Sequence, residues 1–156
     1  MSNTISTRGN NCFTLFANRC NFVSGSAIDK KSKAPEAPDQ FLHKVGIPSE
    51  LTTDGGKELH LGRWGELCQR YTRPQKLTEL YSPWQNDTEH TGGIIKRKVF
   101  HLMRRTSTFL RLWDYCWEYV IQLRIMTAHD HMYGESSTPF QQIYGYTPDI
   151  SELLQF

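Results

Sequence analysis

The spacing of hydrophobic positions divides the first third of the chain into short strands and turns. Residues 11–17 and 20–25 are short runs rich in strand-forming residues, and the dipeptide at 18–19 favours a hairpin turn between them. A charged, proline-containing connection follows. Beyond it a short helix is expected near residues 36–45, with Pro38 in its first turn, where proline is tolerated.

In the middle of the chain, predicted strands alternate with a predicted helix. Thr52 and Thr53 favour a short strand, which the glycine pair at 55–56 ends. Apolar residues then recur at helical spacing over residues 61–71, which predicts a helix. Residues 76–81 are a further candidate strand.

Two long helices are predicted in the second half of the chain. Asn86 is a suitable N-cap, and the pattern predicts a helix over residues 87–105 despite two glycines within it. Ser107 or Thr108 can cap the next helix, which is expected to run to about Met126.

The tail carries the start and stop signals of one short helix. Thr138 can cap it, Pro139 suits its first position, and Gly145 can stop it. Together with the strands, these helices give a mixed α/β layout.

Composition narrows the class of protein. The 156 residues are 38% hydrophobic, 22% charged and 12% aromatic, which fits one soluble domain and argues against disorder. The polar start has no signal-peptide pattern, and no apolar run approaches the roughly 18 residues that span a bilayer. The four cysteines show no CxxC spacing. We therefore expect a reduced intracellular protein, nuclear or cytoplasmic, that is neither secreted nor bound to a membrane. The net charge of +2 does not by itself predict nucleic-acid binding.

Two carboxylates stand where functional side chains are common in α/β folds. Asp54 follows a predicted strand, although Asp-Gly is also one of the commonest turn pairs. Glu89 follows Asn86 by three residues, a capping-box pattern, and the helix dipole favours its ionised form. Counting about 100° per residue places Glu89 between Met103 and Phe100, toward the packed side of its helix. For Asp54 local sequence favours the turn, whereas for Glu89 it leaves the capping and the metal-binding interpretations open.

Carboxylates at these positions suit a divalent metal ion. Mg²⁺ takes oxygen ligands and keeps several waters, so few carboxylates hold it together with substrate phosphate. Two such ions about 3.5–4 Å apart can activate an attacking oxygen and stabilise a leaving one. That chemistry normally needs a shared third carboxylate, so Asp54 and Glu89 alone are one ligand short.

The segments GIPSELTTDGGKEL and YSPWQNDTEH, which contain Asp54 and Glu89, resemble the catalytic core of copia-type retroelement integrases. In that family one catalytic Asp lies in a GIP…DG segment, and the catalytic Glu follows a Pro-x-x-Asn loop at the start of a helix. Here 34 residues separate the two carboxylates, close to the family spacing. The segments RLWDYCWEYV and TPFQQIYGYTPDISEL extend the resemblance over nearly the whole chain.

The resemblance implies a fold and an activity. The fold is RNase H-like, a mixed sheet flanked by helices, and the activity is DNA 3′-end processing and strand transfer that depends on Mg²⁺ or Mn²⁺. Asp54 and Glu89 would be catalytic residues and metal ligands, with element ends and target DNA as partners and a homo-oligomer as an option. Residues 1–127 would form a partial catalytic core, and residues 128–156 a post-core segment with one short helix.

The sequence departs from the family at two places. The family's first catalytic Asp, on the first and central strand, has no counterpart, because no acidic residue precedes residue 29. The resemblance therefore implies a core without its first strand, which does not catalyse alone. Gly92 and Gly93 replace other residue types, and each costs about 1 kcal/mol relative to Ala inside a helix.

A basic stretch follows Glu89, since residues 90–113 include no acidic residue. In an arbitrary protein it would be a solvated helix face. Beside a suspected metal site, however, Lys96, Arg97 and Arg104 are predicted to contact the DNA backbone.

The tryptophans and two histidines are further candidates for a functional or a structural role. Trp84, in the loop before the second carboxylate, is a candidate nucleic-acid contact. Trp64, Trp113 and Trp117, at helical spacing, are expected in the core. His129 and His131 lack the second pair of ligands found in structural zinc sites, so we expect surface histidines.

The sequence thus predicts a fragment of a copia-type integrase catalytic core that is inactive as this chain. The alternative is a non-catalytic nucleic-acid-binding or assembly remnant of a mobile element. A spurious reading frame without function is the third interpretation.

Overall fold

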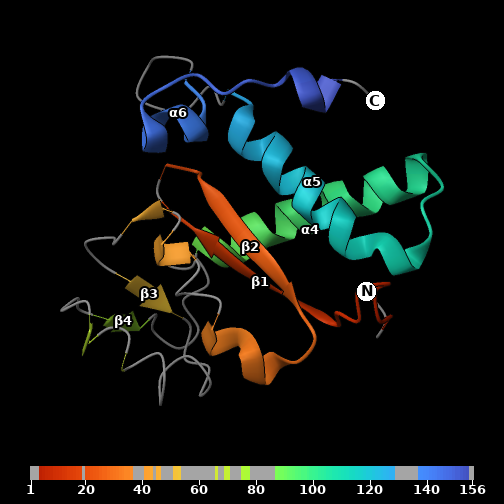
Figure 1. The fold of residues 1–156 in the computed structure, drawn as a ribbon, viewed down its shortest axis with the longest axis horizontal. Helices are drawn as coiled ribbons and strands as arrows, with labels where there is room; N and C mark the ends of the chain where they lie inside the picture. Colours follow the sequence, from red (N-terminus) through yellow and green to blue (C-terminus); the bar gives the residue numbers. More distant parts are fainter. Residues whose placement is uncertain are drawn as a thin grey trace.

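A two-stranded hairpin under two long helices forms the centre of the molecule (Figure 1). The structure, a computed structural model, describes residues 4–18, 20–36, 41–43, 45–46, 51–53, 66, 69–70, 75–77, 87–128 and 137–154. The hairpin strands are β1 (Cys12–Ala17) and β2 (Val23–Ile28), and the helices are α4 (Asp87–Arg105) and α5 (Trp113–Met126). In these ranges no helix is long and apolar enough to cross a membrane.

The turn of the hairpin depends on Asn18. The two strands pair antiparallel along their whole length. The Asn18 side-chain oxygen accepts hydrogen bonds from the backbone N–H groups of Cys20 and Phe22, both at 3.0 Å, as in an Asx turn. Because this turn extends to Phe22, the second strand begins at Val23, and its predicted start at residue 20 was wrong.

One face of the hairpin forms the floor of the hydrophobic core. Alternate residues of β1, namely Phe13, Leu15 and Ala17, pack against the core from this face, as the two-residue period of a strand requires. The buried hydrophobic residues of the cluster are Val23, Ile95, Val99, Met103, Trp113, Cys116, Val120 and Ile121. Trp117 stacks on Phe13 with ring centroids 4.8 Å apart. The prediction that Trp113 and Trp117 belong to the core is therefore confirmed.

The connection between α4 and α5 differs from its prediction. The backbone N–H of Thr108 donates to the Met103 carbonyl at 2.9 Å, that of Ser107 donates to the Arg104 carbonyl at 3.4 Å, and Ser107 has a φ of 52°. This is a Schellman-type helix end, with serine at a position that favours glycine. Ser107 and Thr108 therefore close α4 instead of capping the next helix, and the 3-10 helix η3 (Leu110–Leu112) precedes α5.

A buried carboxylate holds the N-terminal residues on α5. The side chain of Asp114 is fully buried and accepts hydrogen bonds from Arg8 Nε at 2.8 Å and from Asn10 Nδ2 at 3.0 Å. Arg8 also pairs with Glu118 at 2.8 Å and lies 4.1 Å from the centroid of the Tyr115 ring. Burial raises the pKa of Asp114, but the hydrogen bonds that it accepts outweigh burial, so this pKa lies below its usual value.

A second, smaller sheet accompanies the hairpin. The strands β3 (Leu51–Thr53) and β4 (Gln75–Leu77) pair parallel. Both were predicted as strands, β4 with a start one residue later and an end beyond it. With an antiparallel and a parallel pair, the described strands have the mixed character that the sequence predicted.

Short helical segments complete the picture. The 3-10 helix η1 (Lys31–Glu36) was not predicted, because its charged, proline-containing sequence suggested only a connection. Helical residues at 41–43 and 45 agree with the short helix predicted there. A last 3-10 helix, η4 (Ser151–Leu154), lies near the C-terminus.

The C-terminal part packs on α5. The helix α6 (Pro139–Tyr144) follows Thr138, whose side chain accepts a hydrogen bond from a backbone N–H of the first turn at 3.0 Å. It ends at Gly145, which has a φ of 79°. The predicted cap, first proline and stop are therefore confirmed. Tyr144 meets Phe22 edge to face, with centroids 6.0 Å apart, which ties α6 to the hairpin turn.

Replacing the buried carboxylate tests the link between the N-terminal residues and α5. We expect Asp114→Asn to lower the free energy of unfolding by about 2 kcal/mol at pH 7, because Arg8 and Asn10 lose a charged acceptor. Since the folded-state pKa of Asp114 is depressed, its stabilisation is present above the unfolded pKa and is lost as pH falls through the folded pKa. The difference between wild type and variant should therefore shrink in acid.

Urea denaturation at pH 7 and at about pH 3 measures this difference. Glu118→Gln is the matched control, because that carboxylate is 41% exposed and its ion pair should contribute little. An Asp114→Asn difference that stays constant with pH would contradict the assignment.

Candidate functional site

The helix α4 has one buried side and one exposed side. Thr91, Ile95, Val99 and Met103 are buried and recur every four residues, so they form one stripe along the helix. Ile95 and Val99 have no exposed surface. This stripe fixes the rotation of α4 over the hairpin and thereby decides which other side chains face outward.

The two glycines lie within an uninterrupted α4, on different sides of it. A Cβ atom at Gly92 would lie 3.4 Å from Leu15 Cδ2, so Gly92 faces β1 at close range. A Cβ atom at Gly93 would meet nothing within 4 Å, and Gly93 is exposed. The glycines do not break the helix, and only Gly92 stands at a close approach of two elements.

Glu89 occupies the first turn of α4 and is exposed. The prediction that it lies toward the packed side was wrong. Thr91 and Ile95, rather than Glu89, take the first positions of the buried stripe. Glu89 is thus an outward carboxylate in the first turn of α4, where a ligand can reach it from solvent.

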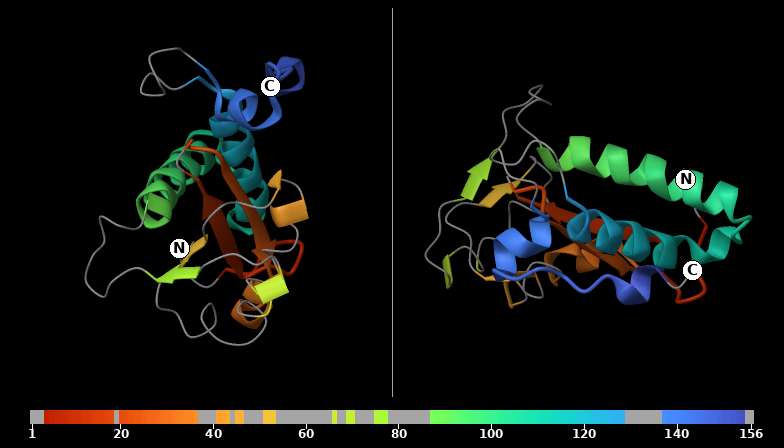
Figure 2. Two further views of the ribbon diagram at one scale, coloured as in Figure 1. Left: turned by 90° about the vertical axis from the view of Figure 1, so that its left-hand side faces the viewer. Right: turned by 90° about the horizontal axis from the view of Figure 1, so that it is seen from above.

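Asp54 comes directly after β3 but lies outside the described residues, as do Trp64, Trp84 and Asn86. Their roles therefore stay predictions. Thr53 is the last residue of β3. Both views of the ribbon place β3 and the beginning of α4 at the same end of the molecule (Figures 1 and 2).

Of the two predicted metal ligands, Glu89 belongs to the described residues. Across the described residues, no three His, Cys, Asp or Glu side chains gather into a group that could hold a metal ion. Glu89 has the oxygen ligands and the exposure that Mg²⁺ binding requires, so its chemistry fits this ion. His129 and His131 also lie outside the described residues, so their predicted surface position stays a prediction.

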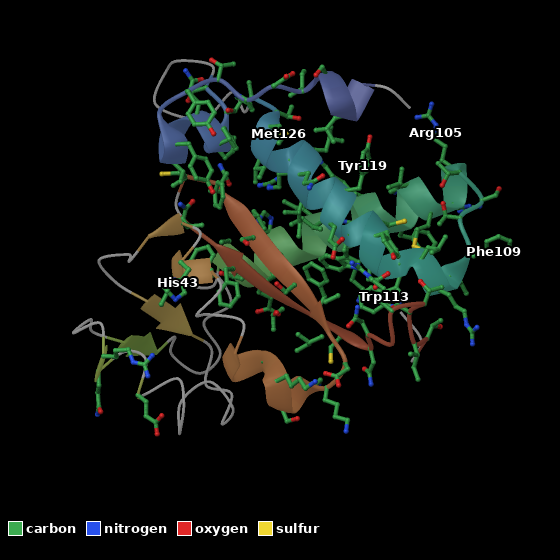
Figure 3. The ribbon with its side chains drawn as sticks, viewed as in Figure 1. His43, Arg105, Phe109, Trp113, Tyr119 and Met126 are labelled. Atoms are coloured by element: carbon green, nitrogen blue, oxygen red, sulfur yellow. The ribbon has the colours of Figure 1, made fainter. Side chains whose placement is uncertain are left out.

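The predicted nucleic-acid contacts lie on the exposed side of α4. Lys96, Arg97 and Arg104 are all exposed, so each ammonium or guanidinium group is accessible to a phosphate. At about 100° per residue, Lys98 and Arg105 project to another side of the helix. Figure 3 shows Arg105 at the far end of α4.

Phe100 is a surface residue for which the sequence predicted no function. Its side chain is 56% exposed, although it lies in the middle of a 19-residue helix that packs on the core. The helical spacing already contained the signal, because Lys96 and Arg104 lie four residues before and after it. Because Phe100 lies among the exposed cations of α4, it is a further candidate contact.

No family model matches the sequence, and no curated protein does either. Among solved structures, a chain of the simian T-cell lymphotropic virus intasome in complex with PP2A regulatory subunit B56 gamma is similar, with a TM-score of 0.71 and 16% identity over 88% of this chain. The chain spans about half, 51%, of that viral chain.

The magnesium complex of the HTLV-2 integrase catalytic core domain is similar in two forms. Its dimeric form has a TM-score of 0.66 and 20% identity, with 86% of this chain and 84% of that domain covered. Its trimeric form has a TM-score of 0.63 and 17% identity, with 85% and 93% covered. The chain therefore has the fold of a retroviral integrase catalytic core, and the predicted RNase H-like class is confirmed.

Replacing each glycine by alanine tests the placement of Gly92 and Gly93 on α4. We expect Gly93→Ala to raise the free energy of unfolding by about 1 kcal/mol, because Ala limits the unfolded backbone and its Cβ meets open space. Gly92→Ala should gain less, because its Cβ would contact Leu15.

Thermal denaturation of both variants measures the difference. If Gly93→Ala destabilised the protein more than Gly92→Ala did, the placement of the two glycines on α4 would be wrong.

Proposed function

We propose that this chain is a piece of a copia-type retroelement integrase catalytic core, in which Asp54 and Glu89 are two of the metal ligands. The observation that carries the proposal is the position of Glu89, an exposed carboxylate in the first turn of α4 within an integrase-type fold. The GIP…DG segment around Asp54 and the Pro-x-x-Asn loop before Glu89 support it. An intracellular location, in the nucleus or the cytoplasm, is part of the proposal.

Mg²⁺ or Mn²⁺ would be the resident metal, and the magnesium complex of the HTLV-2 core supports this choice. Asp54 and Glu89 would hold it, and the bound ion would supply activation of the attacking oxygen. Glu89 contributes a carboxylate in the first turn of α4. Glu89 lies on the same helix as the cationic groups, so one helix would carry both a metal ligand and the phosphate contacts.

Lys96, Arg97 and Arg104 would orient the DNA. Their side chains leave the exposed side of α4 within about three turns of helix, so they can bind successive phosphates of one strand. Trp84 would add a contact from the loop before α4. In this arrangement the cations hold the strand, and the carboxylates lie at the N-terminal end of the same helix.

The chain alone would not catalyse. Residues 1–28 contain no carboxylate, and Asp29, which follows β2, is bonded to Lys33 at 3.0 Å. The set that two-metal chemistry needs would therefore remain one ligand short. The division into a core, residues 1–127, and a post-core segment, residues 128–156, belongs to the same proposal.

The second candidate function is a non-catalytic nucleic-acid-binding or assembly remnant of a mobile element. The exposed cations on α4 favour it, because they bind phosphate whether or not the carboxylates hold metal. The dimeric and trimeric forms of the HTLV-2 core support a homo-oligomer in either case.

Charge reversal on α4 tests nucleic-acid binding, which both candidates share. The affinity for a short DNA duplex is measured by fluorescence anisotropy over a range of salt concentrations. We expect the triple variant Lys96→Glu, Arg97→Glu, Arg104→Glu to flatten the slope of log K against log salt by about 0.9 for each lost phosphate contact. The single variants Lys96→Glu and Lys98→Glu are compared as well, because Lys98 lies on another side of the same helix and its reversal should change the slope less. An unchanged slope in the triple variant would exclude this face as the DNA contact.

Activity separates the two candidates from a complete enzyme. Purified chain with Mn²⁺ and element-end DNA should give no strand transfer, because a metal ligand is missing. Joining that disappears in Glu89→Gln would overturn the proposed inactivity, while it would establish the role of Glu89.

A further inference from the structure

Phe100 lies at the centre of a cationic surface on α4. Lys96 and Arg104 are four residues before and after it, and Arg97 is three residues before it, so all three are its neighbours on the helix. All are exposed, and Phe100 itself is 56% exposed. We call these four residues, Lys96, Arg97, Phe100 and Arg104, the α4 face.

The fold does not account for the position of this ring. The core side of α4 is occupied by Ile95, Val99 and Met103, which are almost completely buried. Phe100 makes an edge contact with the neighbouring imidazole of His101 at 6.2 Å between centroids, and His101 is itself exposed. A ligand can reach this exposed ring, and the cations beside it on the helix favour a ligand that carries phosphates.

We infer that the α4 face binds single-stranded nucleic acid, with one base stacked on Phe100 and the flanking phosphates held by the cations. This inference rests on the proposed nucleic-acid-binding function and names the form of the substrate. Cationic side chains that follow the backbone, together with an aromatic side chain that stacks on a base, are how proteins bind single strands without reading sequence.

The spacing of the α4 face suits one strand. Lys96 and Arg104 each lie about 6 Å from Phe100 along the helix axis, because an α-helix rises about 1.5 Å per residue. A strand along the helix would therefore place a phosphate on either side of the stacked base. Arg97 adds a third cation beside the ring, where it can reach the same strand.

A continuous duplex would contact the cations of the α4 face but would give Phe100 no base to stack on. Its phosphates can reach the cations, but its bases are stacked inside and show only their edges in the grooves. Phe100 would then meet sugar and phosphate and gain no stacking partner. An acidic polypeptide would likewise engage the cations and leave the aromatic face without a base. Unpaired nucleotides are the ligand that satisfies both kinds of side chain.

The experiment compares ligands with and without bases that can stack. Fluorescence anisotropy of the full chain is measured with a deoxythymidine 12-mer, an abasic strand of the same number of phosphates, and a blunt duplex. We expect Phe100→Ala to weaken binding to the 12-mer about tenfold, while binding to the abasic strand and the duplex changes little. Phe100→Trp should retain the affinity for the 12-mer.

Phe109→Ala is the matched control. Phe109 is 81% exposed and lies beyond the end of α4, off the α4 face (Figure 3). It should leave all three affinities unchanged. Circular dichroism of each variant checks that α4 is retained, and Phe100→Trp keeps the test valid if the Ala variant fails to fold.

The possible results separate single-strand binding at Phe100 from the proposed nucleic-acid-binding function on which it rests. Salt-dependent binding of duplex with no effect of Phe100 on the 12-mer would overturn the inference and leave the proposed function standing. Equal competition by polyglutamate and the 12-mer would also overturn the inference. If wild-type chain bound none of the three DNA ligands at low salt, the proposed function would fail as well.

Discussion

The burial of Ile95 and Val99 against the hairpin is the interaction on which the rest of the structure depends. These two side chains have no exposed surface, and they lie in one cluster with Val23 of β2. Because a helix carries its side chains at fixed angles, burying this stripe sets the direction of every other residue of α4. The exposure of Glu89 at its start and of the α4 face further along are consequences of that single rotation.

Two further arrangements keep the helices in place. The Schellman-type end at Ser107 reverses the chain after α4, so that α5 can return along it to complete the core. Asp114, buried at the start of α5, then fixes the N-terminal residues through Arg8 and Asn10. A buried charge of this kind is tolerated because its hydrogen bonds are made. The described residues of the candidate site, Glu89 and the exposed cations, lie on α4 and take no part in this network.

Capping and stop residues in the sequence correctly predicted the helices whose ends depend on neighbouring residues. The bounds of α4 and the cap, proline and glycine of α6 follow from neighbouring residues, and the structure has them as predicted. The second hairpin strand was placed too early, because Asn18 accepts two backbone N–H groups and lengthens the turn. The start of α5 was misplaced because Ser107 resembles an N-cap in sequence but adopts a left-handed conformation after α4.

The candidate site was predictable only in part for a similar reason. Helical spacing identified the apolar side of α4, but the exposure of Glu89 depends on which part of that side meets the hairpin, and this is a tertiary property. Phe100 was overlooked because an apolar residue in an amphipathic helix is expected to be buried, whereas here the core is filled without it. The pairing of Asp54 with Glu89 stays a prediction that rests on the resemblance, because Asp54 lies outside the described residues.

We propose that Asp54 and Glu89 bind the same divalent ion. Titration of isotopically labelled chain with Mn²⁺, followed by the paramagnetic broadening of backbone amide signals, tests whether they do. We expect the amides of residues 54 and 89 to broaden together at one metal concentration, and Glu89→Gln to weaken both effects. Broadening at only one of the two positions, or broadening that Glu89→Gln leaves unchanged, would contradict it.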